Sequence, residues 1–345
     1  MPLTRYIGVA SAIVVYNSLK GGLVAAVILT VLFGLIGYWA GSEWLIEASD
    51  DLTILLALFF LPPVCALVSG LALGSRLKKH AVTYEAPKWE YSPTVHDIGE
   101  LTKTMKRYRG ENFRVLATSN LLHFFVPALL IVAITTTPYY AGYIGIGIGL
   151  VWVLFTVIAT VMVFCLSCYA GFTSSRNAAS DEFTPKLIRE TAWLAKSSEK
   201  IPGVSESKIV VDEATNGPIR IYRSPRVLLR VRGLEEWSYI YCWSNELRAI
   251  NRIQCSLTVP DSSARVRWIW SSEDPYFVKH GERNVESYYV RFPLPPPQGH
   301  MDVKDIKPLL SNAVAIVCLE WLAAGGMKQS VEPTLQALGL TLPRR

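Results

Sequence analysis

The residue types and spacing that could bind a ligand are clearest in two pairs of arginines in the second half of this 345-residue sequence. Side chains alternate between the two faces of a strand, so Arg230 and Arg232 share one face of their strand, and Arg265 and Arg267 share one face of theirs. Guanidinium groups bind carboxylates and phosphates, so we predict a face for an anionic ligand, either an anionic lipid or an acidic partner. The alternative is a solvated strand face whose charge is balanced by glutamates on neighbouring strands.

A second candidate is a polar site within an apolar stretch, formed by Asn120 and His123. An ionisable side chain inside a membrane segment is a functional candidate by default. The structural alternative is a bond to a helix neighbour, since Pro127 leaves the carbonyl of His123 without its helical donor. No Asp, Glu, Lys or Arg falls within any predicted membrane span. This lack of a relay partner argues against proton-coupled transport.

Signatures of catalysis are missing from the sequence, which contains no Gly-x-Ser-x-Gly, Walker A or HExxH motif. The CxxC pair of Cys165 and Cys168 lies in an apolar stretch without a second pair, so a zinc site is not expected. Two polar pairs in loops are the only support for acid–base chemistry: His280 with Glu282, and His300 with Asp302. We therefore expect a protein that is not an enzyme and that needs no metal or cofactor.

Charges occur in blocks that indicate membrane-spanning helices. Hydrophobic residues make up 51% of the chain and charged residues 18%, and uncharged runs of 22, 24 and 61 residues follow Lys20, Asp51 and Arg114. A bilayer core of about 30 Å needs roughly 20 helical residues. We predict four transmembrane helices, with a break at "TTTPYYAGY" between the last two: 21–41, 53–74, 115–136 and 143–170. The apolar segment 6–19, within the N-terminal region 1–20, is short for a span, so we favour an interfacial segment over a fifth membrane-embedded helix.

The distribution of basic residues predicts which side of the membrane the loops face. The segment 75–114 holds nine Lys or Arg and five Asp or Glu, whereas the segment 41–52 holds four acidic residues and no basic one. Basic residues near the ends of spans mark the cytoplasmic side. We therefore predict an inner (plasma) membrane protein with a basic cytoplasmic loop at 75–114 and both termini in the cytoplasm. The basic residues expected at the membrane surface are Arg76, Lys78, Lys79, Lys103, Lys106, Arg107 and Arg109.

Glycine pairs with small-xxx-small spacing predict close packing between the apolar helices. These pairs are Gly37/Gly41, Gly70/Gly74 and Gly145/Gly149. We expect them to serve packing within one bundle of two transmembrane hairpins, 21–74 and 115–170, with a homo-oligomer as the alternative.

The residues from Arg176 onward predict a soluble α+β part. A juxtamembrane amphipathic linker helix is expected at 184–197, within the segment 171–204, with Thr184 as its N-cap. From 205 to 325, short segments rich in Val, Ile, Tyr and Trp with a period of two predict about seven strands, followed by one apolar helix. Residues 326–345 are expected to form a tail with weak helical character. In the strand that carries Arg265 and Arg267, two tryptophans are expected to face the core: Trp268 and Trp270.

The order of about seven strands and one C-terminal helix resembles that of a pleckstrin-homology-like (PH-like) domain. The phrase "YCWSNELRAI" at 241–250 looks like the tryptophan-containing turn of bacterial PH-like domains that are tethered to membrane helices. The resemblance implies that the helix closes one end of a bent sheet. The soluble part carries 23 Lys or Arg and 19 Asp or Glu, an excess too small to predict a nucleic-acid partner.

Together these features predict an integral membrane adaptor or accessory protein. Its cytoplasmic domain would bind a protein, a lipid headgroup or a small ligand, in an assembly, secretion-system, defence or immunity role. A protein partner on the cytoplasmic side is expected. The alternatives are a channel or passive transporter gated by the cytoplasmic domain, and an enzyme at the membrane surface.

Overall fold

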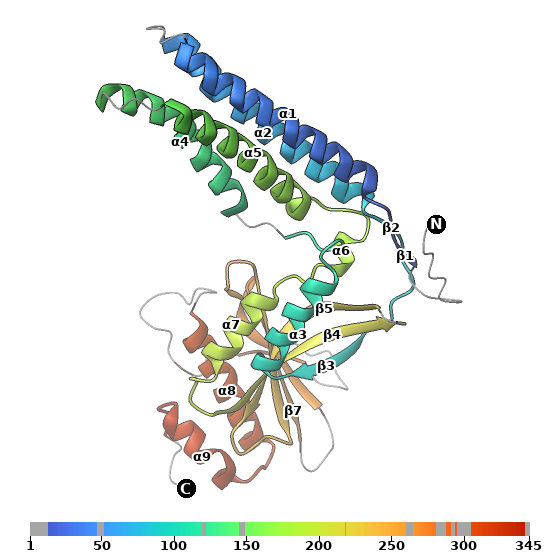
Figure 1. The fold of residues 1–345 in the computed structure, drawn as a ribbon. Coiled ribbons are helices and arrows are strands. Elements are labelled where there is room, and N and C mark those ends of the chain that lie inside the picture. The colour runs from blue at the N-terminus through green and yellow to red at the C-terminus, as the bar shows by residue number, and fades with distance from the viewer. Residues whose placement is uncertain are drawn as a thin grey trace. The chain divides into compact units, whose positions relative to one another are not determined.

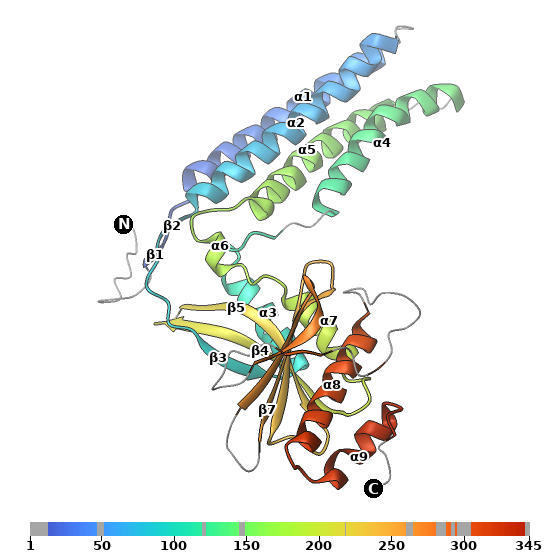
Figure 2. The same ribbon diagram turned by 180° about the vertical axis from the view of Figure 1, so that it is seen from behind.

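The structure is a computed structural model that describes residues 13–46, 52–118, 122–144, 149–217, 219–259, 265–280, 288–290, 294 and 305–341. The chain forms two compact units, each built from two separate stretches of sequence (Figures 1 and 2). The helical unit comprises Met1–Lys88 and Arg109–Thr184, and the sheet unit comprises Trp89–Tyr108 and Pro185–Arg345. This confirms the predicted division into apolar helices and a separate domain rich in strands.

Four long apolar helices make up most of the helical unit: α1 (Lys20–Ile46), α2 (Leu52–His80), α4 (Leu122–Ile144) and α5 (Gly149–Ser174). The short helix α6 (Ser180–Phe183) and a two-stranded antiparallel sheet of β1 (Ile13–Tyr16) and β2 (Val82–Glu85) belong to the same unit. Helix α5 is the common partner, because α1, α2 and α4 all pack against it.

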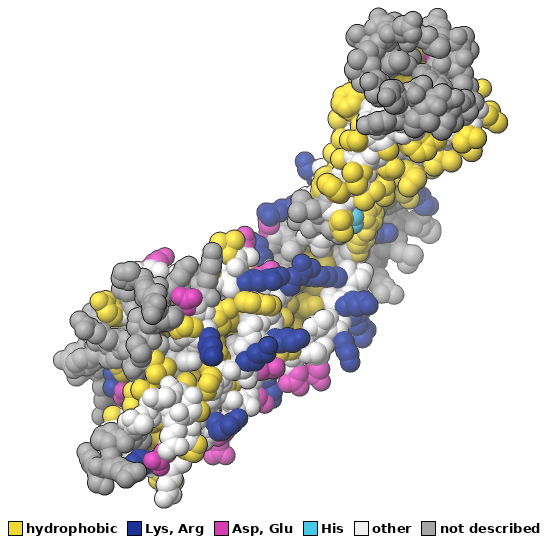
Figure 3. Space-filling model, turned by 90° about the vertical axis from the view of Figure 1, so that its left-hand side faces the viewer, with side chains coloured by type: hydrophobic (Ala, Val, Ile, Leu, Met, Phe, Trp, Pro, Cys, Tyr) yellow, Lys and Arg dark blue, Asp and Glu magenta, His cyan; other side chains and the backbone are white. Residues whose placement is uncertain are grey.

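The long helices have the length and surface of membrane spans. Among the described residues, Lys20–Glu43, Phe59–His80 and Leu150–Ser174 are long and apolar enough to cross a membrane, and Leu122–Thr137 is a shorter apolar stretch of α4. They expose many large hydrophobic side chains, such as Val27, Leu129 and Leu154, and on the side drawn in Figure 3 their described surface is largely hydrophobic (yellow). Such a surface is stable only in lipid or detergent, so the structure supports a membrane protein.

The boundaries of α4 differ from the predicted third and fourth spans. Helix α4 begins at Leu122 rather than at 115, because residues 112–115 form a turn in which the backbone N–H groups of Val115 and Leu116 bond to the Asn112 carbonyl. It then continues through the predicted break at 135–143 to Ile144, so that prediction is wrong. Three consecutive threonine hydroxyls bond to carbonyls of the preceding turn, which keeps the helix's polar groups paired: Thr135 to Ile131 (3.0 Å), Thr136 to Val132 (2.8 Å) and Thr137 to Ala133 (2.6 Å).

The N-terminal apolar segment is partly a strand. Residues Ile13–Tyr16 of the predicted interfacial segment 6–19 pair with Val82–Glu85 as β1 and β2. The Asn17 amide extends this contact by donating to the His80 carbonyl (2.9 Å). Residues 6–12 lie outside the described part of the chain. The described end of this segment is therefore extended rather than helical.

Glycines allow α5 to approach α1 and α2 closely. A Cβ atom added to Gly37 of α1 would lie 3.1 Å from the Thr156 carbonyl oxygen, and one added to Gly70 of α2 would lie 2.6 Å from that of Phe164. The Thr156 hydroxyl also donates to the Gly37 carbonyl (3.0 Å). Gly41 and Gly74 make similarly tight approaches to α5. These pairs therefore serve packing within one bundle. Gly145 lies outside the described residues.

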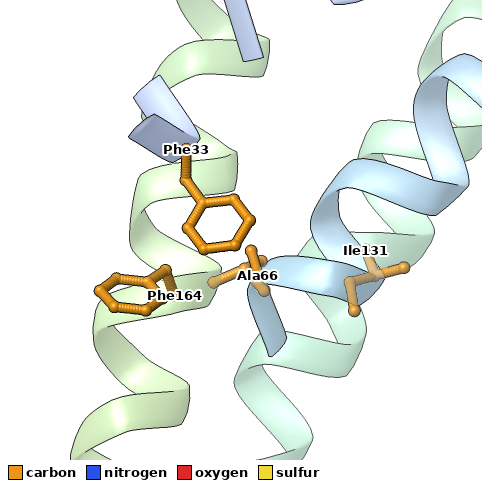
Figure 4. Close-up of a cluster of buried hydrophobic side chains, with 5 residues drawn as sticks. Phe33, Ala66, Ile131 and Phe164 are labelled. Carbon is orange, nitrogen blue, oxygen red and sulfur yellow. The ribbon is translucent and has the colours of Figure 1, made fainter. Parts of the chain in front are cut away.

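The interior of the helical unit is filled by apolar side chains from all four long helices. Its central cluster consists of Phe33, Ala66, Ile131, Val163 and Phe164 (Figure 4). The rings of Phe33 and Phe164 lie 5.3 Å apart. The four long helices thus pack around a hydrophobic core.

One antiparallel sheet of eight described strands forms the sheet unit, and its spatial order follows the chain order from β3 to β10. The C-terminal part contributes seven strands, as predicted, and the eighth, β3 (Ser92–His96), comes from the predicted loop 75–114. The seven are β4 (Val204–Asn216), β5 (Ile219–Val231), β6 (Ser238–Ser244), β7 (Ile250–Thr258), β8 (Arg265–Ser271), β9 (Asp274–His280) and β10 (Tyr288–Val290).

Helices cover one face of this sheet. Helix α7 (Ile188–Ser198) packs against β4, β5 and β6, and α8 (Ile306–Ala323) packs against β6 and β7. Helix α9 (Lys328–Ala337) follows and packs on α8 (Figures 1 and 2). The helix α3 (Ile98–Glu111) contacts β5 through the rings of Tyr108 and Tyr222, 5.2 Å apart.

The linker helix predicted at 184–197 is part of this packed structure. It begins at Ile188 rather than at Thr184, because the backbone N–H of Thr184 closes the end of α6 by bonding to the Ser180 carbonyl. Its buried residues agree with the predicted amphipathic face and include Thr191 and Leu194, which lie against the sheet. The helix α7 is thus a core element of the sheet unit.

Helix α8 also meets the length and composition of a membrane span. Its side chains are buried within the sheet unit, however, from Leu309 to Cys318 without interruption. Beneath it the sheet contributes fully buried residues such as Ile240, Ile253 and Cys255. Burial of apolar side chains against a sheet is the main source of stability for such a helix.

Candidate anionic-ligand face

The strand register brings the two predicted arginine pairs to the same face of the sheet. Leu229 of β5 pairs with Ile240 of β6, and continuing this register places Arg230 opposite Tyr239. Tyr239 pairs with Ser256 of β7, and Ser256 pairs with Arg267 of β8. Residues that pair across antiparallel strands point to the same side. Arg230 and Arg267 therefore stand in one row, three strand spacings or roughly 14 Å apart.

The other two predicted arginines continue this arrangement along the strands. Arg265 lies two residues from Arg267 on the same strand and pairs with Thr258 at the end of β7. Arg232 follows β5 directly and is exposed. We call the side of β5, β6, β7 and β8 that carries these arginines the outer face. As predicted, Trp268 and Trp270 point the opposite way and are buried.

A ladder of three aromatic side chains runs along the middle of the outer face, on β6. Tyr239, Tyr241 and Trp243 alternate with the buried Ile240 and Cys242. Their neighbouring ring centroids are 4.9 Å and 6.0 Å apart. The rings are half-buried, so they form an apolar strip between the arginine-bearing strands.

Two further arginines lie over this ladder. The guanidinium of Arg226, on β5, is 5.2 Å from the ring centroid of Tyr241, and that of Arg252, on β7, is 5.2 Å from that of Trp243. Cation–π contacts of this kind contribute about 0.5–1 kcal/mol at exposed sites. They also restrict the motion of these guanidinium groups, which reduces the entropy lost when an anion binds.

The charges of the outer face leave an excess of arginine. Asp212 is paired with Arg226 (2.9 Å), and Glu206 is paired with Lys208 (2.7 Å). The hydrogen bond to the Glu206 carboxylate raises the pKa of Lys208 above its ordinary value, so this pair stays charged. Five other arginines of this face form no ion pair within the part of the chain that the structure describes: Arg230, Arg232, Arg252, Arg265 and Arg267.

The outer face is open, because the helices of the sheet unit lie on the other side. The Ser207 hydroxyl bonds to the Ala195 carbonyl of α7 (2.9 Å), and the Cys255 thiol approaches the Ala313 carbonyl of α8 (3.8 Å). Both side chains belong to the face opposite Arg230 and Arg267. The guanidinium-bearing residues Arg252, Arg265 and Arg267 are exposed. On the side drawn in Figure 3, Lys and Arg side chains lie among hydrophobic ones rather than in one continuous patch.

In the helical unit, Lys78 differs from its predicted position at the membrane surface. Its side chain is fully buried, and its ammonium donates to the carbonyls of Phe113 (2.9 Å) and Leu116 (2.7 Å). The two carbonyls between them are also bonded, Arg114 by the Asn177 amide (2.9 Å) and Val115 by the Ser180 hydroxyl (2.6 Å). Four consecutive carbonyls, 113–116, thus accept side-chain bonds, and we call this segment the carbonyl junction.

Aromatic rings surround the buried ammonium and extend to His123. The Nζ atom of Lys78 lies 4.8 Å from the ring centroid of Phe172 and 5.8 Å from that of Phe113. Tyr169 lies next in the stack, and its ring meets His123 edge-on at 5.0 Å. The Nδ1 atom of His123 is buried and has no hydrogen-bond partner in the described part of the chain. Asn120, its predicted companion, lies outside the described residues.

The other predicted basic residues are exposed. Arg76 and Lys79 lie on the last turns of α2 on either side of Lys78. Four more lie on α3, away from its buried residues Leu101 and Met105: Lys103, Lys106, Arg107 and Arg109. Their predicted contact with a membrane surface stays a prediction.

No arrangement for catalysis is visible among the described residues. His280 is half-buried at the end of β9, where it pairs with Arg267, and its predicted companion Glu282 lies outside the described part, as do His300 and Asp302. Within that part no three His, Cys, Asp or Glu residues form a potential metal site. The chain matches no protein-family model, no curated protein and no solved structure.

Sequence reasoning missed two features of these sites. The aromatic ladder was visible as alternation in "EWSYIYCWS", but the side on which it lies depends on the register with β5 and β7. The burial of Lys78 depends on a segment 35 residues later in the chain, and no local signal indicates that contact.

Proposed function

We propose that this protein is an integral membrane adaptor whose sheet unit binds an anionic partner through the outer face. The observation that supports this most directly is the open face of β5–β8, where Arg230, Arg252, Arg265 and Arg267 lie beside an aromatic strip and form no ion pair with any residue that the structure describes. Arginine and aromatic residues are the types enriched at binding surfaces. The ligand would be an acidic protein segment, a lipid headgroup or a small anion.

The apolar helices support an anchoring role in this proposal. Their interior is filled by the cluster that contains Phe33 and Phe164, and α5 approaches α1 and α2 closely at glycines. We propose the inner (plasma) membrane as the site, with both termini in the cytoplasm, because basic residues concentrate in the segment 75–114.

We also propose a PH-like character for the sheet unit. Its seven C-terminal strands form an antiparallel meander, and the helix α8 follows them and closes the core. Strand order and helix position are the supporting features. Fold likeness alone does not define a function, so the adaptor proposal depends on the outer face and not on this likeness.

Affinity purification of the full-length protein from native membranes in mild detergent tests the proposal. We expect a stoichiometric companion, identified by mass spectrometry, that is lost in the charge-reversal variant R230E/R265E/R267E. The matched control is R189E/K196E/K200E, which reverses the same number of charges on and beside α7, on the opposite side of the sheet. A companion retained equally by both variants, or a homo-oligomer without any companion, would contradict the proposal.

A further inference from the structure

We propose that the outer face binds the phosphate-bearing headgroups of the bilayer that holds the apolar helices. This inference rests on the proposed function, because it names the ligand of the same face. Three observations support it: the spacing of the arginines, the state of the aromatic ring faces, and the covalent link between the two units.

The arginines are spaced for several anionic groups rather than for one. Arg230 and Arg267 lie roughly 14 Å apart across the sheet, and Arg265 lies about 7 Å from Arg267 along its strand. These are Cα spacings, and the guanidinium groups keep them when the side chains extend away from the sheet. A phosphate contacts only guanidinium groups within about 3 Å, so the extended array suits several anionic groups. A surface that carries many phosphates can contact all of these side chains at once.

The aromatic ladder favours headgroups over single-stranded nucleic acid. Platforms for nucleic acid stack bases on free ring faces. Here the rings of Tyr241 and Trp243 are already covered by Arg226 and Arg252 at 5.2 Å, and all three rings of the ladder are half-buried. Tyrosine and tryptophan are instead the residues that favour the interface between bilayer and water.

The chain keeps the sheet unit tethered to the apolar helices. Only six residues, 86–91, join β2 to β3, and an extended chain of six residues spans roughly 20 Å. A short tether raises the effective concentration of the bilayer at the sheet unit, so weak individual contacts are sufficient for binding.

Binding to vesicles tests the inference with the full-length protein. The protein is reconstituted in nanodiscs of phosphatidylcholine alone and mixed with vesicles of phosphatidylcholine, with or without about one-third phosphatidylglycerol. We expect flotation with the anionic vesicles only, and its loss in high salt. Each basic side chain near an anionic surface contributes about a fivefold factor in affinity, so neutralisation in R230Q/R265Q/R267Q should weaken binding about 100-fold. The control R189Q/K196Q/K200Q should bind like the wild type.

The outcomes that overturn the inference are distinct from failure of the adaptor proposal. Equal binding of both variants, or binding that does not depend on phosphatidylglycerol, would refute the lipid ligand. Face-dependent binding of oligo-dT or polyglutamate, without binding to anionic vesicles, would assign the face to another polyanion and leave the adaptor proposal standing. Competition by inorganic phosphate at low concentration would indicate a single small anion. An unchanged thermal unfolding midpoint shows that each variant is folded.

Discussion

Replacement of Lys78 by methionine tests how the carbonyl junction is held. The substitution keeps an unbranched apolar side chain, one atom shorter than lysine, but removes the donor for the carbonyls of Phe113 and Leu116. A buried carbonyl left without its donor costs about 1–3 kcal/mol. The cost for two such carbonyls is partly offset, because burying methionine does not require the desolvation of a charge. We therefore expect the free energy of unfolding to fall by about 2–4 kcal/mol.

The assay is thermal unfolding of the full-length protein in mild detergent. For a chain region of this size, 1 kcal/mol lowers the midpoint by about 2–4 °C, so K78M should unfold roughly 5–15 °C earlier than the wild type. The control is K79M, because Lys79 is the exposed neighbour on the same helix and its replacement should change stability by less than about 0.5 kcal/mol. Hydrogen exchange of residues 112–118 should increase in K78M. Equal midpoints for K78M and K79M would refute the reasoning.

Other predictions concern helix packing, thiols and conduction. G74A should destabilise the helical unit by about 1–3 kcal/mol, because the added methyl group overlaps the backbone of α5. In the control G21A the added methyl group meets no atom within 4 Å, so its stability should equal that of the wild type. Thermal unfolding of the two variants compares them. Burial raises the pKa of Cys318 to about 12 and that of Cys255 well above 9.0, while unfolded thiols ionise near 9.0. The free energy of unfolding should therefore fall as pH rises above about 9. A pH series of unfolding midpoints in which C255A shows the same slope as the wild type would contradict this. As expected for an adaptor, liposomes containing wild type or H123A should be equally impermeable to ions, and a selective flux lowered by H123A would favour a channel.

The sequence was sufficient to predict the division into apolar helices and a strand-rich domain. Charge-free runs and period-two alternation are local signals, and each directly reflects the environment of the backbone. The predicted break at 135–143 was wrong, because three threonines followed by a proline suit either a turn or a helix. In the structure, the hydroxyls of Thr135, Thr136 and Thr137 bond to carbonyls within helix α4. Local composition alone does not distinguish these two outcomes.

The candidate site was predictable only in part. The shared face of Arg265 and Arg267 follows from strand alternation, but the row that joins Arg230 to Arg267 depends on the pairing of four strands. A register shift of one residue would send a strand's arginines to the opposite face. The sequence around Lys78 does not distinguish it from an exposed lysine. Lys78 is buried because the carbonyl junction packs against it in the folded chain.

Photo-crosslinking within native membranes tests directly whether the outer face is the binding surface. A benzophenone amino acid replaces Gln254, which pairs with Tyr241 and Ile269 in the middle of that face, and the matched control places it at the exposed Lys196 of α7. We expect a discrete protein or lipid adduct at position 254 that disappears in R230E/R265E/R267E. Equal adducts at positions 254 and 196, or an adduct at 254 that survives charge reversal, would contradict it.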